Sequence, residues 1–170
     1  MKRSSITEFL NLLLESKLSR EIGTQFAKEV CVDYGTTNQV RVDYMSFHPA
    51  HQLSVSGIEK GIFTCYEVKS CKADFKSGFG QNYLGEKNYL VMTMELYKEI
   101  LHELPDKVGV MVAVPYGIKA EDYFFETEKL TEENIKNEKW CLKVIRNSYA
   151  LPSNRKKSMI ELLYAMLRAK

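Results

Sequence analysis

The pattern of hydrophobic and polar residues predicts helices at both ends of the chain. Apolar side chains recur every three or four residues near the start and again near the end. This spacing predicts an amphipathic helix over residues 5–17, opened by a capping box of Ser5 and Glu8, and a terminal helix that begins near Asn154. The helical spacing continues weakly over residues 19–28, where Gly23 is expected to interrupt or bend the helix.

The next part of the chain alternates apolar and polar residues with a period of two, which is typical of half-buried strands. Strands are predicted over residues 29–34 and 40–47, and the turn residues 35–38 between them favour an antiparallel hairpin. A surface loop over residues 49–57 then leads to a third strand over residues 63–70. Three consecutive strands therefore follow the first helix.

The second half of the chain predicts a crossover unit. Strand, helix and strand are expected over residues 89–93, 95–104 and 108–114, and the last run is apolar throughout, as in a strand buried on both faces. Residues 116–138 read as a surface excursion with one short helix, and residues 140–145 as an edge strand. The predicted fold class is α/β, with a mixed sheet, antiparallel first and parallel later, flanked by helices.

Length and composition place the chain among ordinary globular proteins. We expect one domain over residues 1–170, large enough to bury a core without disulfides. Neither a signal peptide nor a membrane-spanning run is recognised, and the four cysteines lack metal-binding spacing, so a cytoplasmic protein without membrane contact is expected. Because the net charge is only +2, any surface that binds nucleic acid must be local.

Candidate chemistry lies on two of the predicted strands. Alternation places Cys65, Glu67 and Lys69 on one face of their strand, and Asp43 on the polar face of its own strand, opposite Val40, Val42 and Tyr44. If the two strands are neighbours, Asp43, Glu67 and Lys69 meet. Two carboxylates repel each other unless a cation lies between them, and such oxygen ligands suit Mg²⁺ or Mn²⁺.

The arrangement of Asp43 followed by Glu67-Val68-Lys69 resembles the D…E-x-K signature of the PD-(D/E)XK, or restriction-endonuclease-like, nuclease superfamily. Asp74 follows Lys69 at the distance seen in some small DNA-repair-type members, although valine replaces the usual proline before Asp43. The segment from Glu59 to Tyr89 is also similar to small bacterial and prophage proteins. The resemblance covers about residues 25–115.

This resemblance implies a metal-dependent nuclease that hydrolyses DNA in repair, defence or a mobile element. It implies that Asp43 and Glu67 bind Mg²⁺ or Mn²⁺ together with the Val68 carbonyl, and that Lys69 assists the attacking water. Asp33 lies in a second Val-Asp-Tyr sequence, but Asp43 is preferred because its strand leads toward Glu67.

Further residues are candidates for the same site. Glu29 could add a carboxylate, with Glu21 as the second choice, whereas Asp74 either supports the site or caps a helix. Local basic and polar side chains are the candidates for contact with DNA: Ser70, Lys72, Lys76, Gln81, Asn82, Arg155, Lys156 and Lys157.

The principal alternative is a protein that keeps the nuclease fold for binding nucleic acid or for assembly, without catalysis. In either case DNA is the expected partner. The sequence leaves open whether the chain acts as a homodimer or in a larger repair or phage assembly.

Overall fold

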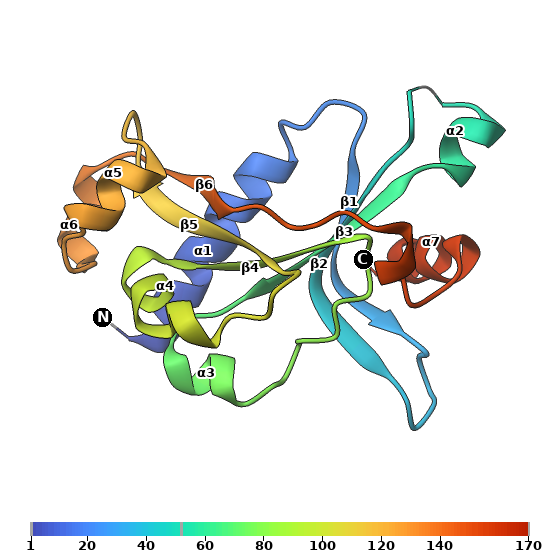
Figure 1. Ribbon diagram of the computed structural model, residues 1–170, viewed down its shortest axis with the longest axis horizontal. Helices are drawn as coiled ribbons and strands as arrows, with labels where there is room; N and C mark the ends of the chain where they lie inside the picture. The colour runs from blue at the N-terminus through green and yellow to red at the C-terminus, as the bar shows by residue number, and fades with distance from the viewer. Residues whose placement is uncertain (1, 52, 170) are drawn as a thin grey trace.

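A single six-stranded mixed sheet forms the centre of the computed structural model, which describes residues 2–51 and 53–169 (Figure 1). The strands follow one another across the sheet in the order of the sequence. β1, β2 and β3 are antiparallel, β4 and β5 run parallel to β3, and β6 is antiparallel to β5. Their bounds are β1 Gln25–Val32, β2 Val40–His48, β3 Ile62–Val68, β4 Lys87–Thr93, β5 Gly109–Pro115 and β6 Trp140–Arg146.

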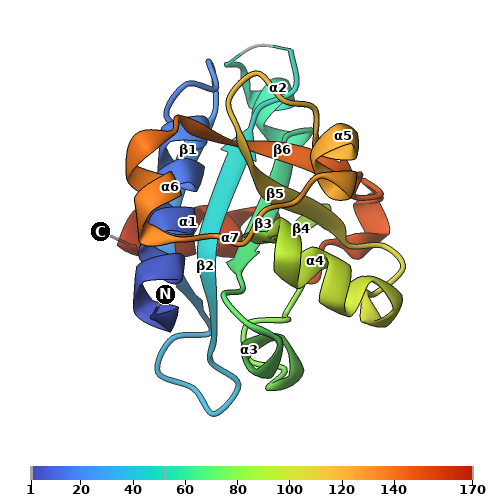
Figure 2. The same ribbon diagram turned by 90° about the vertical axis from the view of Figure 1, so that its left-hand side faces the viewer.

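Helices cover both faces of the sheet. α1 lies on one face, and α4 lies on the other (Figure 2). α4 packs against β4 and β5, α5 lies beside α4 against β5 and β6, and α7 packs against β1. The helices are α1 Arg3–Leu18, α2 Val55–Glu59, α3 Lys72–Lys76, α4 Met94–Ile100, α5 Ala120–Phe125, α6 Glu132–Asn137 and α7 Met159–Arg168, with 3₁₀ turns at Leu101–Glu103 and Pro152–Asn154.

The core is built from strand residues that alternate between the two faces. Val91 packs in the cluster beneath α1, whereas its neighbour Leu90 lies across the sheet in the cluster with Ile100 of α4. On that same side, Phe63 of β3 packs with Leu162 of α7. Both faces of the central strands are thus buried, as the continuous apolar runs predicted.

The main predictions of architecture are confirmed. The chain forms the expected first helix, the antiparallel hairpin, the third strand, the crossover unit and the antiparallel edge strand. The short helix after Thr131 is present as α6, and it begins with a capping box. The coarse fold class, α/β with a mixed sheet between helices, is therefore correct.

Two predictions about the start of the chain are wrong. Residues 19–28 do not continue as a helix, because Gly23 takes a left-handed φ of +77° and β1 already begins at Gln25. The capping box of Ser5 and Glu8 does not form either. The helix begins earlier, at Arg3, and its N-cap residue makes no side-chain capping bond.

The terminal helix also differs from its prediction. α7 begins at Met159, not near Asn154, because Ser158 and Glu161 form a reciprocal capping box there. The basic residues 155–157 therefore precede the helix and do not occupy its first turn. Segments expected to be irregular contain the short helices α2, α3 and α5. Within residues 2–51 and 53–169, no helix combines the length and apolar character that crossing a membrane requires.

Candidate metal site and active-site pocket

The regular alternation of β2 breaks at Asp43. Val42 packs in the cluster beneath α7, whereas Tyr44 packs beneath α1 on the opposite face. The prediction that Val42 and Tyr44 share a face is therefore wrong. On the neighbouring strand, Glu29 takes an unusual positive φ of +51° at the same level, between the pairs Val30–Val42 and Lys28–Tyr44. In both strands of the hairpin the alternation shifts by one residue at this point, so that Ala27 and Val30 of β1, like Val42 and Met45 of β2, pack in the cluster beneath α7.

This irregularity places the Asp43 carboxylate at the end of β3. The pairing of β2 with β3 ends at Tyr44 and Tyr66, and beyond it Asp43 Oδ2 accepts a hydrogen bond from the backbone N–H of Val68 at 2.9 Å. A side chain thus replaces a backbone carbonyl as the acceptor. Asp43 comes to lie beside Glu67, as the sequence predicted.

Glu67 is a buried carboxylate without a partner. Its side chain is 2% exposed, and neither carboxylate oxygen has a hydrogen-bond partner among the described residues. Burial, and then the neighbouring charge of Asp43, raise the pKa of Glu67 from its ordinary 4.5 to about 9, while Lys69 opposes this shift. Two ionised carboxylates can only accept hydrogen bonds, so the pair requires a shared proton or a cation.

The loop after α3 holds the other side of the site. Gly80 lies against the Glu67 carboxylate so closely that a Cβ atom at this position would overlap it, and its φ of +76° also favours glycine. Lys69 is 3% exposed, and its Nζ donates to the carbonyl of Phe79 at 2.6 Å. Its backbone N–H donates to Val91 on β4 at 2.9 Å. Glu67 and Lys69 are thus fixed by both the sheet and the loop.

Asp43, Glu67 and Lys69 line one cavity of about 510 Å³. Its walls come from the start of α1, the ends of β2 and β3, and the loop of residues 78–82. The wall is mostly polar, with these contributors besides the three residues above: Arg3, Thr7, Asn11, Glu29, Gln39, Val40, Arg41, Tyr44, Val68, Asp74, Gly78, Phe79, Gly80 and Asn82.

Arg3 is a pocket residue that sequence reasoning missed. Its guanidinium forms an ion pair with Asp74 at 2.8 Å and donates to Ser70 Oγ at 3.3 Å. Asp74 accepts from the Ser70 N–H at 3.3 Å from inside the first turn of α3, whereas Cys71 occupies the N-cap position without a side-chain capping bond. Asp74 therefore does not cap as the N-cap residue. It ties α1 to the end of β3.

The additional carboxylates lie in different places. Glu29 lines the cavity, but its side chain forms an ion pair with Arg41 at 2.8 Å. Glu21 pairs with Lys17 at 3.2 Å and does not line this cavity. Asp33 pairs with Lys157 at 2.7 Å, far from Glu67 in the hairpin. Of these acids, Glu29 alone is near enough to join the site.

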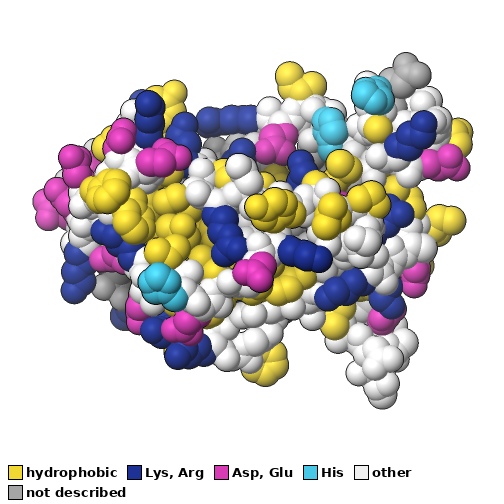
Figure 3. Space-filling view, in the orientation of Figure 1, with side chains coloured by type: hydrophobic (Ala, Val, Ile, Leu, Met, Phe, Trp, Pro, Cys, Tyr) yellow, Lys and Arg dark blue, Asp and Glu magenta, His cyan; other side chains and the backbone are white. Residues whose placement is uncertain are grey.

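The residues predicted to contact DNA do not gather around the cavity. Among them only Asn82 lines it, and the Asn82 amide donates to the Arg41 carbonyl at 3.1 Å. Basic and acidic side chains are interspersed on the face in Figure 3, without a large patch of one sign. The predicted DNA-contact residues other than Asn82 have partners within the protein: Ser70 with Arg3 and Asp74, Lys72 with Glu99 and Glu103, Lys76 with Glu103, Gln81 with the Phe75 carbonyl, Arg155 with Glu86, Lys156 with the Asn82 carbonyl, and Lys157 with Asp33.

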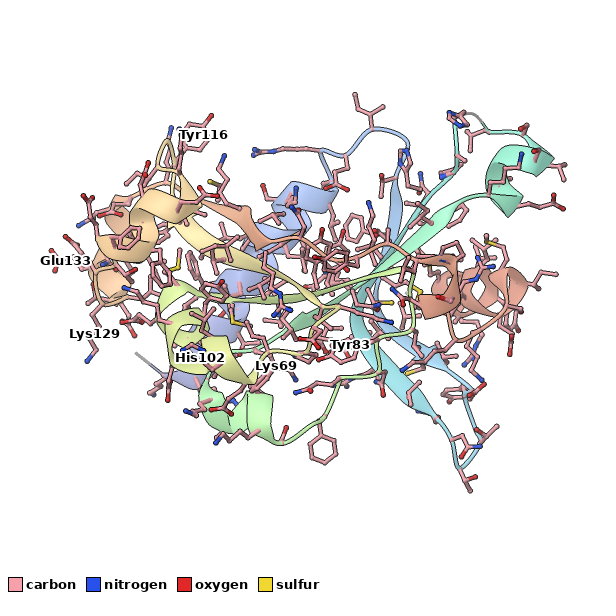
Figure 4. The ribbon with its side chains drawn as sticks, in the orientation of Figure 1. Lys69, Tyr83, His102, Tyr116, Lys129 and Glu133 are labelled. Carbon is pink, nitrogen blue, oxygen red and sulfur yellow. The ribbon has the colours of Figure 1, made fainter. Side chains whose placement is uncertain are left out.

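Tyr83 is a second unpartnered group near the carboxylates. Its hydroxyl is buried and has no hydrogen-bond partner in the part of the chain that the structure describes. Burial, and then the charge of Glu67, raise the pKa of Tyr83 to about 12. Lys69 and Tyr83 both lie between the α3–α4 end of the molecule and the β1–β2 hairpin (Figure 4).

The donor set fits some metal ions better than others. Across the two described ranges, no group of three or more Asp, Glu, His or Cys side chains is placed to hold a metal ion. Zinc or calcium sites made wholly by protein side chains need more ligands than Asp43 and Glu67 offer. Mg²⁺ is commonly bound by one or two carboxylates, keeps several waters and is completed by substrate phosphates. The pair therefore fits Mg²⁺ or Mn²⁺ with an oxygen-rich substrate.

Comparison of the chain with protein-family models, curated proteins and solved structures finds no match.

Proposed function

We propose that this chain is a restriction-endonuclease-like nuclease that hydrolyses DNA phosphodiester bonds with Mg²⁺ or Mn²⁺, in repair, defence or a mobile element. The observation that carries the proposal is the buried carboxylate of Glu67, which lies beside Asp43 and has no partner among the described residues. An unpaired buried charge is costly. A divalent cation would compensate the buried charge, and Asp43 and Glu67 would then serve as its ligands.

Asp43 and Glu67 hold the cation in this proposal, together with the backbone carbonyl of Val68. When bound, the cation neutralises charge on the phosphate and lowers the pKa of a bound water. Asp43 keeps its hydrogen bond from the Val68 N–H through Oδ2, which orients the carboxylate and leaves Oδ1 for the metal. Because Gly80 has no Cβ atom, the loop leaves room for the Glu67 carboxylate.

Lys69 assists the attack of water. Its ammonium has three N–H donors, and the Phe79 carbonyl accepts one of them. The remaining donors can orient the attacking water or stabilise charge that develops on a phosphate oxygen. Because Lys69 follows Glu67 by two residues at the end of β3, it lies on the same side of the strand.

Two arginines of the cavity wall can bind the phosphate. Arg3 pairs with Asp74, and Arg41 pairs with the exposed Glu29. The Arg41–Glu29 pair is exposed, and exposed ion pairs contribute only about 0–1 kcal/mol, so a phosphate can replace Glu29 at small cost. Asp74 is less exposed and also accepts from the Ser70 N–H. Arginine also suits phosphate because its N–H groups can donate to two oxygens at once.

The alternative function is that of a nucleic-acid-binding or accessory protein without catalysis. The internal pairing of the predicted DNA-contact residues favours the accessory form of this alternative, because any protein that binds DNA, with or without catalysis, presents free cations to the phosphates. Cation-dependent protection against unfolding separates the two, since only a working carboxylate site is stabilised by Mg²⁺ or Mn²⁺.

The activity is tested with a panel of linear, single-stranded, flapped and branched DNA in Mg²⁺ and in Mn²⁺. We expect the wild type to cleave at least one of these and Lys69→Met to be at least 100-fold slower, within the range of about 10²–10³ for loss of one electrostatic donor. Glu133→Gln, on an exposed position of α6, is the matched control and should cleave normally. DNA binding without cleavage by the wild type would favour the accessory role.

A further inference from the structure

An exposed aromatic ring stands at the edge of the candidate active-site cavity. The side chain of Phe79 is 81% exposed, and the residue lines the cavity together with Glu67 and Lys69. Several other large hydrophobic side chains are exposed on this protein. Within the described ranges, Phe79 alone among them lines this cavity.

The backbone of Phe79 is fixed to the candidate catalytic residues. Its carbonyl accepts the hydrogen bond from Lys69 Nζ, and the next residue, Gly80, lies against the Glu67 carboxylate. Gly78 and Gly80 take left-handed φ values of +72° and +76°, so two tight backbone turns bracket the phenylalanine. The backbone that carries the ring is therefore fixed beside the site, whereas the ring itself is exposed to solvent and does not belong to the core.

Charge alone offers little to hold DNA at this cavity. The cationic side chains in the described lining are Arg3, Arg41 and Lys69, and each arginine must leave a carboxylate partner before it binds a phosphate. Binding by phosphate contacts depends on the number of cations that become free to pair with phosphates. An aromatic platform would supply sequence-independent binding that these few cations cannot, because every base has a π-face that can stack.

We propose that Phe79 stacks on an unpaired base next to the scissile phosphate, so that the substrate is DNA with a single-stranded end, flap or gap at the cleavage site. This inference rests on the proposed nuclease function. A base inside a double helix has both faces covered by its neighbours, whereas an unpaired base can offer a face to the ring. A cavity of about 510 Å³ is also of a size that encloses a small ligand, such as one nucleotide.

Binding is the first test, because it does not require cleavage. The dissociation constants of a fluorescent single strand, a flap and a blunt duplex are measured with Ca²⁺ in place of Mg²⁺ or Mn²⁺. For Phe79→Ala we expect binding to the single strand and the flap to weaken roughly 5- to 100-fold, as for the loss of one base–aromatic stack, and binding to the duplex to change less than about twofold. Phe79→Trp should restore the affinity.

Phe125→Ala is the matched control. Phe125 is 83% exposed on α5 and does not line the cavity, so its loss should leave all three affinities unchanged. Equal losses for Phe79→Ala and Phe125→Ala, or no loss for Phe79→Ala, would overturn the stacking role. Unfolding midpoints of both variants near that of the wild type confirm that folding is intact, since neither ring is buried.

A fluorescent base analogue and a cleavage assay distinguish failure of this inference from failure of the proposed function. Fluorescence of 2-aminopurine at the position beside the cleaved bond should be quenched by the wild type and not by Phe79→Ala. Cleavage by the wild type that prefers blunt duplex over flapped DNA would overturn the inference and leave the nuclease standing. A wild type that binds none of the three DNAs would overturn both.

Discussion

Replacing Glu67 by glutamine should stabilise the protein when divalent cations are absent, although it removes a residue proposed to be essential. The folded protein binds a proton at Glu67 up to a pH of about 9, whereas the unfolded chain releases it near the ordinary pKa of 4.5. Between these two values the folded state holds more protons than the unfolded state. The contribution of Glu67 to the free energy of unfolding therefore falls as the pH rises, by about 1.4 kcal/mol per pH unit.

The size of this stability change follows from the interval between the two pKa values of Glu67. At pH 7, Glu67 lowers the free energy of unfolding by roughly 3 kcal/mol relative to its value below pH 4. This penalty is a large part of the stability of a domain of this size. Glutamine has nearly the same shape, carries no charge and can donate to Asp43. Glu67→Gln should remove most of the penalty, so that its gain over the wild type grows from pH 5 to pH 9.

Urea unfolding in EDTA at pH 5, 7 and 8.5 measures this difference directly. We expect the unfolding free energy of the wild type to fall more steeply with pH than that of Glu67→Gln, and the control Glu133→Gln, at an exposed position of α6, to follow the wild type. Addition of Mn²⁺ at pH 7 should stabilise the wild type and the control, but not Glu67→Gln. Parallel pH profiles for the wild type and Glu67→Gln would refute the reasoning.

Three other substitutions test separate parts of the structure. Gly80→Ala should lower the thermal midpoint more than Gly78→Ala, because both positions have a left-handed φ but only Gly80 lies against Glu67; equal shifts would contradict this. Ser158→Ala should cost about 1 kcal/mol in urea unfolding, since it removes the cap of α7, and an unchanged midpoint would count against that cap. Tyr83→Phe removes a buried hydroxyl without a partner, so calorimetry in EDTA should show equal or greater stability; a large loss would reveal a partner.

The layered fold could be predicted from the sequence because its signals are local. The period-two runs and the continuous apolar run before Val114 identify strands, and the order of strands and helices favours a mixed sheet. The position of candidate site residues at the end of β3 could also be predicted, since Glu67 and Lys69 interrupt an otherwise apolar strand. The start of α7 was missed because apolar spacing does not show where a helix begins, whereas the capping box at Ser158 does.

Other parts of the site depend on contacts that leave no local trace. Arg3 reaches Asp74 from the opposite end of the site, and no spacing in the sequence links them. The shift of alternation at Asp43 coincides with the positive φ of Glu29 on the neighbouring strand, which non-glycine residues adopt rarely. Lys72 likewise pairs with Glu103, which joins α3 to the turn after α4. The sequence alone therefore did not show whether the lysines near Lys72 are free to bind DNA or are paired with acidic side chains.

The central claim is that Asp43 and Glu67 together bind a divalent cation, and calorimetric titration of the protein with Mn²⁺ at pH 8 tests it most directly. We predict that the wild type binds Mn²⁺, that Asp43→Asn binds it at least 10-fold more weakly, and that Glu133→Gln binds it as the wild type does. Glu29→Gln shows in the same experiment whether this further carboxylate of the cavity takes part. Absence of Mn²⁺ binding by the wild type, or equal binding by Asp43→Asn, would contradict the claim.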